Sequence, residues 1–261
     1  LSGMSDPLDL TGKVVLVTGG GKGVGRGITD SFLARGASVV VCGRTEREKL
    51  PACGTNVAVF MTCNVKDPEQ IEACIADIMA QFGRLDVLVN NVGGTPYTDA
   101  ATASPRFTAN VIGLNLVSPM IFSEAANKVM QGQDSGGCIV NISSVSAVRP
   151  SPGTAAYGAA KAALITLGES QAQMWSPRVR VNSIIVGLVK TEQSHLHYGD
   201  EAGVAAVAST IPLERMADPQ DIGNACVYLA SPLSGSSSGT CLTVHGGGEK
   251  PSFLDAANSE H

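Results

Sequence analysis

The architecture of this chain follows from residues 13–25, which read KVVLVTGGGKGVG. Residues 13–18 are a short run of apolar and β-branched residues, which predicts a strand buried on both faces. The glycines follow at once, and an amphipathic helix is predicted over residues 26–35, with Gly36 as its C-terminal stop. This order predicts a phosphate site, because a glycine turn lets a ligand approach the backbone and a helix N-terminus offers unpaired N–H groups.

The glycine spacing in this turn is Thr18-Gly19-x-x-x-Gly23-x-Gly25, and the common G-x-G-x-x-G dinucleotide fingerprint fits it in no register. The flanking strand and helix still favour a dinucleotide site over an ordinary glycine-rich turn. The predicted contacts in the turn are Gly19, Gly21, Lys22, Gly23, Val24 and Gly25.

Strands and helices alternate along the rest of the chain. Further strands are predicted over residues 38–41, 57–61, 85–89, 138–142, 179–186 and 241–244, and further helices over 68–82, 110–130, 155–172 and 219–230. The alternation predicts an α/β fold, a doubly wound, seven-stranded parallel sheet with helices on both faces (Rossmann fold). No linker or repeat divides residues 1–261, so one domain is expected, with the irregular segment 187–215 as a lid at the ligand edge.

The end of the second strand indicates which dinucleotide binds. An acid there favours a free ribose 2′-hydroxyl, whereas an arginine favours a 2′-phosphate. Cys42 stands where the acid is expected, Arg44 follows it, and Lys22 can reach the same phosphate. Two cations and no acid favour NADP(H). Glu46 lies nearly at the distance expected for a ribose acid, which keeps NAD(H) possible, and Arg44 can also be a solvated loop charge.

Tyr157 and Lys161 lie four residues apart in a predicted helix and therefore project from the same face. A free tyrosine has a pKa near ~10, and a nearby ammonium lowers that pKa by favouring the phenolate. Such a pair can give or take a proton where a carbonyl becomes an alcohol. The spacing alone also fits a helix face with a hydrogen-bonded tyrosine and a solvated lysine.

Polar residues follow other strands at the same edge of the sheet, where doubly wound sheets bind ligands. Ser143 and Ser144 end the fifth strand, and the stretch 90–94 after the fourth strand lets a ligand lie against its backbone. Asn115 sits among apolar residues inside a helix and needs a partner there, so it is either functional or a structural residue that bends the helix.

These motifs together resemble the short-chain dehydrogenase/reductase family, in its compact single-domain branch. The similarity covers nearly the whole chain, from about Leu10 to Gly247. The matched motifs are TGGGKGVG at 18–25, NNVG at 90–93, Asn115, Ser144 and Tyr157-x-x-x-Lys161.

The resemblance implies an oxidoreductase that interconverts a secondary alcohol and a ketone by hydride transfer with NAD(P), and a homotetramer. It implies that Tyr157 exchanges the proton and that Lys161 lowers the Tyr157 pKa and binds the nicotinamide ribose. Ser144 would hold the substrate oxygen, and Asn115 would support a water that connects Lys161 to solvent. The cofactor contacts outside the glycine turn would be Arg44, Asn64, Val65, Asn91, Gly93, Tyr157, Lys161, Gly187, Val189 and Thr191.

Four residues depart from the pattern of the family. They are Asn64 in place of an aspartate near the adenine, Val92 in place of alanine, Val186 in place of proline and His245 in place of aspartate. An amide can still pair with the adenine edge, and His245 lies in a region that relatives use for subunit contacts.

Composition and residue spacing argue against several other kinds of protein and site. The 261 residues carry a net charge of −5 with no lysine or arginine cluster, which argues against nucleic-acid binding. The seven cysteines are scattered without a C-x-x-C pair, which predicts buried thiols in a reducing compartment rather than disulfides or zinc.

His195 and His197 have no third ligand nearby in sequence, so they are expected to line the substrate pocket and no metal is expected. No signal segment or membrane-length apolar run is found, so a cytoplasmic protein without membrane contact is expected.

Three functions remain open at this stage. The favoured one is an NADP-linked alcohol–ketone oxidoreductase, and the second is a non-catalytic dinucleotide-binding or regulatory module. Reduction of a carbon–carbon double bond is disfavoured, because the related enoyl reductases separate Tyr and Lys by more than the three residues found here. Apolar residues in 187–215 and after Ser144 favour an apolar small-molecule substrate, such as a 3-oxoacyl thioester or a steroid-like ring ketone, and leave its identity and the direction of reaction open.

Overall fold

A seven-stranded sheet forms the centre of the protein, whose computed structural model describes residues 6–256. Its strand order is β5-β2-β1-β6-β7-β8-β9, and every neighbouring pair is parallel. The strands are β1 Val14–Thr18, β2 Ser38–Gly43, β5 Val59–Thr62, β6 Val87–Asn90, β7 Gly137–Ser144, β8 Val179–Val186 and β9 Cys241–Val244. Two further short strands, β3 Ala52–Cys53 and β4 Asn56–Val57, pair in an antiparallel hairpin.

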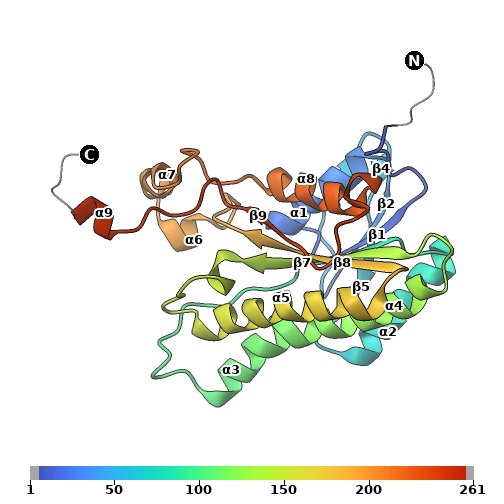
Figure 1. The fold of residues 1–261 in the computed structure, drawn as a ribbon, viewed down its shortest axis with the longest axis horizontal. Coiled ribbons are helices and arrows are strands. Elements are labelled where there is room, and N and C mark those ends of the chain that lie inside the picture. The colour runs from blue at the N-terminus through green and yellow to red at the C-terminus, as the bar shows by residue number, and fades with distance from the viewer. Residues whose placement is uncertain (1–5, 257–261) are drawn as a thin grey trace.

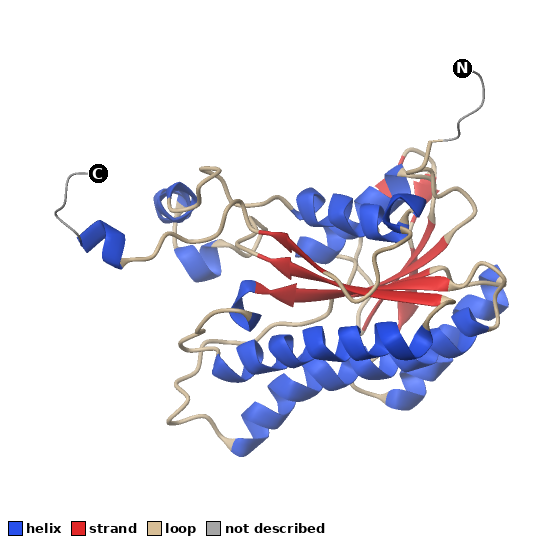
Figure 2. Cartoon of the chain, in the orientation of Figure 1, coloured by secondary structure: helices blue, strands red, loops and turns tan. Residues whose placement is uncertain are grey.

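Helices cover both faces of the sheet (Figures 1 and 2). In Figure 1, α1 and α8 lie above the sheet, and α2, α4 and α5 lie below it. The helices are α1 Gly23–Ala34, α2 Pro68–Phe82, α3 Pro105–Ile112, α4 Ser118–Gln131, α5 Ala155–Trp175, α6 His195–Tyr198, α7 Glu201–Ser209, α8 Pro219–Ala230 and α9 Phe253–Ala256. The predicted α/β fold, a doubly wound seven-stranded parallel sheet, is confirmed.

The core has two halves because strands alternate their side chains between the two faces. Val15 and Val17 of β1 pack with Phe32 of α1 on one side of the sheet. Leu16 packs on the other side, with Ile75 of α2. All five β1 residues are buried, as predicted for a strand between two helix layers.

The order of the strands creates a crevice at one edge of the sheet. The chain runs from β1 outward through β2 to β5, and then returns to the other side of β1 as β6. The connections after β1 and β6 therefore leave on opposite faces of the sheet, which opens the space between their carboxyl ends.

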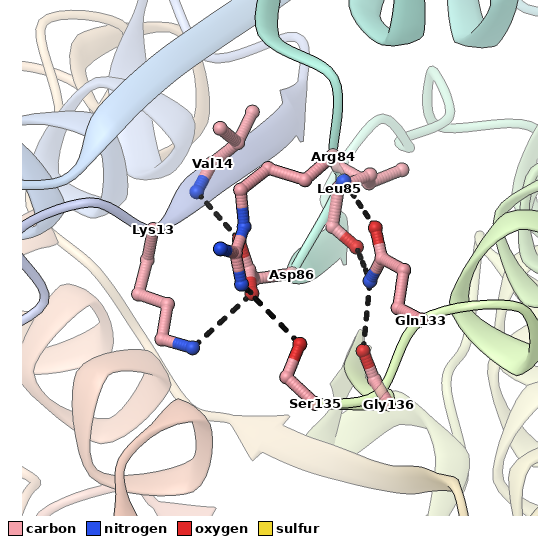
Figure 3. A network of polar contacts seen from close by, with 8 residues as sticks. All are labelled: Lys13, Val14, Arg84, Leu85, Asp86, Gln133, Ser135 and Gly136. Atoms are coloured by element: carbon pink, nitrogen blue, oxygen red, sulfur yellow. Dashed lines mark hydrogen bonds and ion pairs between the residues drawn. The ribbon is translucent and has the colours of Figure 1, made fainter.

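A polar cluster joins the amino ends of β1 and β6 (Figure 3). Asp86, which directly precedes β6, is buried and accepts hydrogen bonds from the Val14 N–H at 2.9 Å and from Arg84 Nε at 2.7 Å, with Lys13 Nζ at 3.3 Å. Burial acts to raise the pKa of Asp86, but these hydrogen bonds and the Lys13 charge outweigh it, so the pKa is lowered. The ion cluster therefore fixes β6 beside β1 at the end of the sheet opposite the crevice.

Several helix boundaries differ from the prediction. The first helix begins at Gly23 rather than residue 26, so that two glycines of the turn belong to it. The helix predicted over 110–130 is already formed at Pro105, because Ser104 Oγ caps it by accepting a hydrogen bond from the Phe107 N–H at 3.1 Å. A π-helical turn, Gly113–Val117, separates this α3 from α4.

The segment 187–215 is not irregular throughout, which corrects the prediction. It contains α6 and the nine-residue helix α7. Asp200 Oδ1 caps α7 by accepting a hydrogen bond from the Gly203 N–H at 3.0 Å, and the alanine-rich sequence that follows is a good helix former. Within residues 6–256, no helix is long and apolar enough to cross a membrane.

Candidate active site

A cavity of about 460 Å³ opens at the carboxyl edge of the sheet, in the crevice between β1 and β6. The glycine turn, the loop after β6, the end of β7 and the start of α5 form its walls. The predicted site residues that line it are Gly19, Lys22, Gly23, Val24, Gly25, Asn91, Gly93, Ser144, Tyr157, Lys161, Gly187, Val189 and Thr191.

The N-terminal residues of α1, which are Gly23, Val24 and Gly25, line this cavity. Lys22 precedes the helix without a side-chain cap, and the first turn holds no acidic residue. The Gly23 N–H donates to the Glu192 carboxylate at 3.2 Å, so this helix N-terminus already holds an anionic oxygen of the kind that a phosphate would supply. The residues present therefore fit a dinucleotide pyrophosphate.

The turn is held close to the loop after β6. Thr18 Oγ1 accepts hydrogen bonds from the N–H groups of Asn91 at 3.0 Å and Val92 at 3.1 Å, and Asn91 Nδ2 donates to the Thr18 carbonyl at 2.9 Å. A Cβ on Gly25 would lie 2.4 Å from the Gly19 carbonyl oxygen and 2.5 Å from Asn91 Nδ2. Only glycine fits at position 25, because the Gly19 carbonyl is part of the turn backbone and Asn91 Nδ2 is held by its hydrogen bond to the Thr18 carbonyl.

Tyr157, Lys161 and Ser144 meet on the opposite wall. Tyr157 and Lys161 project from the first two turns of α5, and Ser144 ends β7. Lys161 is buried, its Nζ donates to the Ile142 carbonyl at 2.8 Å, and it lies 5.7 Å from the centre of the Tyr157 ring. Ser143 Oγ donates to the Lys161 carbonyl at 3.0 Å, which ties α5 to β7.

The predicted lowering of the Tyr157 pKa is wrong for this structure. Burial raises the pKa of Tyr157 above its usual value, and the hydrogen bond with Ser144 only partly opposes that effect. The Lys161 ammonium is directed to the Ile142 carbonyl instead, and burial lowers the pKa of Lys161 to about 8. Tyr157 is therefore protonated at neutral pH and suited to donate a proton.

Asn115 is buried in the π-helical turn and holds the loop below Lys161. Its Oδ1 accepts the Gly94 N–H at 2.8 Å, and its Nδ2 donates to the carbonyls of Gly94 at 3.0 Å and Val111 at 2.9 Å. A Cβ on Gly93 would lie 2.7 Å from Asn115 Oδ1 and 3.0 Å from Lys161 Nζ. Asn115 thus has partners of its own within the protein and fixes the backbone that faces Lys161.

Four predicted contacts lie outside this cavity. Gly21 lies in the glycine turn after β1, the exposed Arg44 directly follows β2, and Asn64 Oδ1 accepts a hydrogen bond from the Lys66 backbone N–H at 3.3 Å. The side chain of Val65 is buried in the core, so it presents only its backbone to a ligand.

Sequence reasoning missed several residues around the site. Arg47 lies beside the glycine turn, since a Cβ on Gly21 would be 3.3 Å from its Cγ. Most of the other lining residues lie at or just after the carboxyl end of a strand, and this position in the sequence was the signal that could have identified them. The sequence had already placed Ser143 and the stretch 90–94, which contains Val92 and Gly94, at the ligand edge without assigning them a contact. The other lining residues outside the predicted set are Ile142, Val186 and Gln193.

Residues 19–249 match the sequence profile of a family described as Enoyl-(Acyl carrier protein) reductase. An uncharacterised oxidoreductase of Mycobacterium tuberculosis is 35% identical over 248 residues, which cover 93% of this chain and 94% of that protein. The chain belongs to the short-chain dehydrogenase/reductase family. The predicted family is thereby confirmed.

Further relatives support the same assignment. The 3-oxoacyl-(acyl-carrier-protein) reductase FabG of Vibrio cholerae is 34% identical over 244 residues, covering 92% of this chain and 98% of that protein. The ligand-free structure of aldohexose dehydrogenase from Thermoplasma acidophilum superimposes with a TM-score of 0.85 at 29% identity, covering 97% of this chain and 98% of that one. This short-chain dehydrogenase/reductase is an oxidoreductase that acts on CH–OH or C=O groups, in a family that uses NAD(P).

Proposed function

We propose that the protein interconverts a ketone and a secondary alcohol with NADP(H), using Tyr157 as the proton donor and acceptor. The observation that supports this most is that one cavity joins the α1 N-terminus to Ser144, Tyr157 and Lys161. A dinucleotide bound along it would bring its nicotinamide end toward the half-buried phenol of Tyr157 and the buried ammonium of Lys161 in the cavity wall. When bound, the dinucleotide supplies the hydride, which no side chain can supply.

The side chains of the protein handle the oxygen and the proton. Ser144 donates a hydrogen bond to the substrate carbonyl oxygen, and Tyr157 protonates that oxygen as it becomes an alkoxide. The Lys161 ammonium stabilises the negative charge that develops nearby. Asn115 acts through the Gly93–Gly94 backbone, which it holds against Lys161.

Two smaller cavities flank the reacting groups and are candidates for the substrate tail. One, of about 230 Å³, shares Gly187 with the main cavity and is lined by apolar Val145, Leu188 and Ile211. At this cavity Arg149 and Glu249 form an ion pair of 2.7 Å. The other, of about 350 Å³, lies on the far side of Tyr157. Their apolar side chains favour an acyl chain, and the relative named as a 3-oxoacyl reductase makes a 3-oxoacyl thioester the first substrate to try.

NADPH is expected to bind roughly tenfold or more tightly than NADH, because a 2′-phosphate would form charge-assisted bonds with Lys22 and Arg44. Fluorescence titration of the purified protein with each dinucleotide measures this ratio. Lys22→Ala and Arg44→Ala should each weaken NADPH and leave NADH unchanged, and Arg47→Ala shows whether this third cation contributes.

Lys66→Ala is the matched control, since this exposed lysine is bonded to Asn110 and should not affect either dinucleotide. Tighter binding of NADH, lost in Glu46→Gln, would show that Glu46 reads the ribose and would contradict the preference for NADPH.

The rate of ketone reduction is expected to fall as the pH rises through about 8. Burial lowers the pKa of Lys161 to about 8, so the ammonium that stabilises the alkoxide is present below this pH and lost above it. Because kcat/KM for the dinucleotide reports groups of the free enzyme, its pH profile is the measurement. Tyr198→Phe is the control, because burial also raises the pKa of the Tyr198 hydroxyl. The rate should fall with rising pH in this variant as it does in the wild type. A kcat/KM that instead increases across this range would contradict the role of Lys161.

A further inference from the structure

Three cysteines far apart in the sequence meet beneath the loops near the ends of β2 and β5. Cys42 lies near the end of β2, Cys63 directly follows β5, and Cys74 is on the buried face of α2. Their Sγ atoms all lie within 4.8 Å of one another. Each residue is at most 3% exposed, and none forms a disulfide.

The surrounding fold holds this cluster in place. The parallel strands pair Cys42 with Met61, and the Cys63 N–H donates to the Gly43 carbonyl at 2.9 Å, which sets Cys42 and Cys63 side by side. Cys74 comes from the helix that packs on this face, between Ile71 and Ile75 of the same core half. The three thiols therefore converge from three elements that the core already fixes.

We propose that Cys42, Cys63 and Cys74 form a trigonal site for one soft monovalent cation of the Cu(I) type. Three metal–sulfur bonds of about 2.3 Å in a plane place the sulfurs roughly 4.0 Å apart, so only small shifts are required. Thiolates select soft cations, and a buried site with three thiols suits an ion that accepts three ligands.

Zinc fits this site less well, because structural zinc sites take four ligands. Among the described residues, no histidine or carboxylate joins the cluster to provide the fourth. Binding breaks three S–H bonds, forms three metal–sulfur bonds and releases the three protons to water, with no change in oxidation state. The loaded cluster then carries a net charge of −2.

The position of the site gives it a consequence for the dinucleotide, and this part rests on the proposed function. Cys42 precedes Arg44 by two residues, and Cys63 directly precedes Asn64. The added negative charge would therefore lie near the proposed 2′-phosphate position. Loading the site should weaken NADPH binding by roughly tenfold, and NADH, which lacks that phosphate, should be affected much less.

Anaerobic titration of the reduced full-length chain with Cu(I) against a chromophoric Cu(I) chelator tests the site directly. One ion per chain should be held by the wild type and by two controls, the exposed-thiol variant Cys53→Ala and the variant Cys226→Ala, whose thiol is buried on the other face of the sheet. Cys63→Ala and Cys74→Ala should each bind roughly tenfold or more weakly. Unchanged affinity in either, or loss of the ion in Cys226→Ala, would overturn the site.

X-ray absorption of the loaded wild type decides the question even where a variant fails to fold. Three sulfur neighbours support the site, and a first shell with nitrogen or oxygen overturns it. An NADPH affinity that stays unchanged at full loading overturns the coupling to the dinucleotide. A metal-free protein without NADPH preference would instead show that the proposed 2′-phosphate contacts are wrong, independently of metal binding.

Discussion

Tyr157→Phe is expected to lower kcat for ketone reduction by about a hundredfold to ten-thousandfold, while the dissociation constant of NADPH stays within about twofold. The substitution removes only the hydroxyl, which is the group positioned with Ser144 to protonate the substrate oxygen. The ring keeps its place in the cavity wall beside Lys161. Steady-state kinetics and a fluorescence titration on the same preparation separate the two effects.

Tyr198→Phe is the matched control for this experiment, because it removes a second phenol, at the end of α6, and should retain turnover. Turnover of Tyr157→Phe close to that of the wild type would show that another group donates the proton. Loss of NADPH binding together with turnover would show that Tyr157 is needed for the shape of the cavity rather than for the proton.

Gly25→Ala is expected to weaken binding of NADPH and NADH alike, by about a hundredfold or more. The new methyl group would lie 2.4 Å from the Gly19 carbonyl oxygen, so the turn must move away from the N-terminus of α1. The backbone N–H groups that would bind the pyrophosphate then lose their common direction. Titration with both dinucleotides measures the loss, and thermal unfolding shows whether the fold is kept.

Gly113→Ala provides the comparison, because a Cβ there meets nothing within 4 Å and its backbone φ is −54°. This variant should bind both dinucleotides as the wild type does. Wild-type affinity in Gly25→Ala, with the protein folded, would mean that the glycine turn does not hold the dinucleotide.

Where the sequence signals were strongest, the predicted first and last residues of an element are those observed. Asp67, Pro68 and Gly83 mark the ends of α2, and the predicted bounds 68–82 are those observed. The strand predicted over 179–186 and the helix over 219–230 also match β8 and α8. These segments combine a strong periodicity with a capping or breaking residue at one or both ends.

The predictions that were wrong or absent concern features that depend on tertiary structure, which a single sequence does not show. The glycines at the start of α1 were predicted to be part of a turn. Nothing in the local sequence shows that the helix already begins at Gly23. The Tyr157 pKa depends on burial and on where the Lys161 ammonium points, and both are set by tertiary packing. The cysteine cluster was missed because β2, β5 and α2 bring together three thiols that show no spacing pattern.

The most direct test of the account follows the hydride. The enzyme is supplied with NADPH deuterated at the transferable position and, in parallel, with a 3-oxoacyl thioester, a ring ketone and a 2,3-unsaturated acyl thioester, and the products are analysed by mass spectrometry and NMR. We expect an alcohol product with deuterium on the carbinol carbon, formed at a rate that Tyr157→Phe lowers by about a hundredfold or more. Deuterium on a saturated carbon chain from the unsaturated thioester, or tight NADPH binding without label transfer to any of the three, would contradict it.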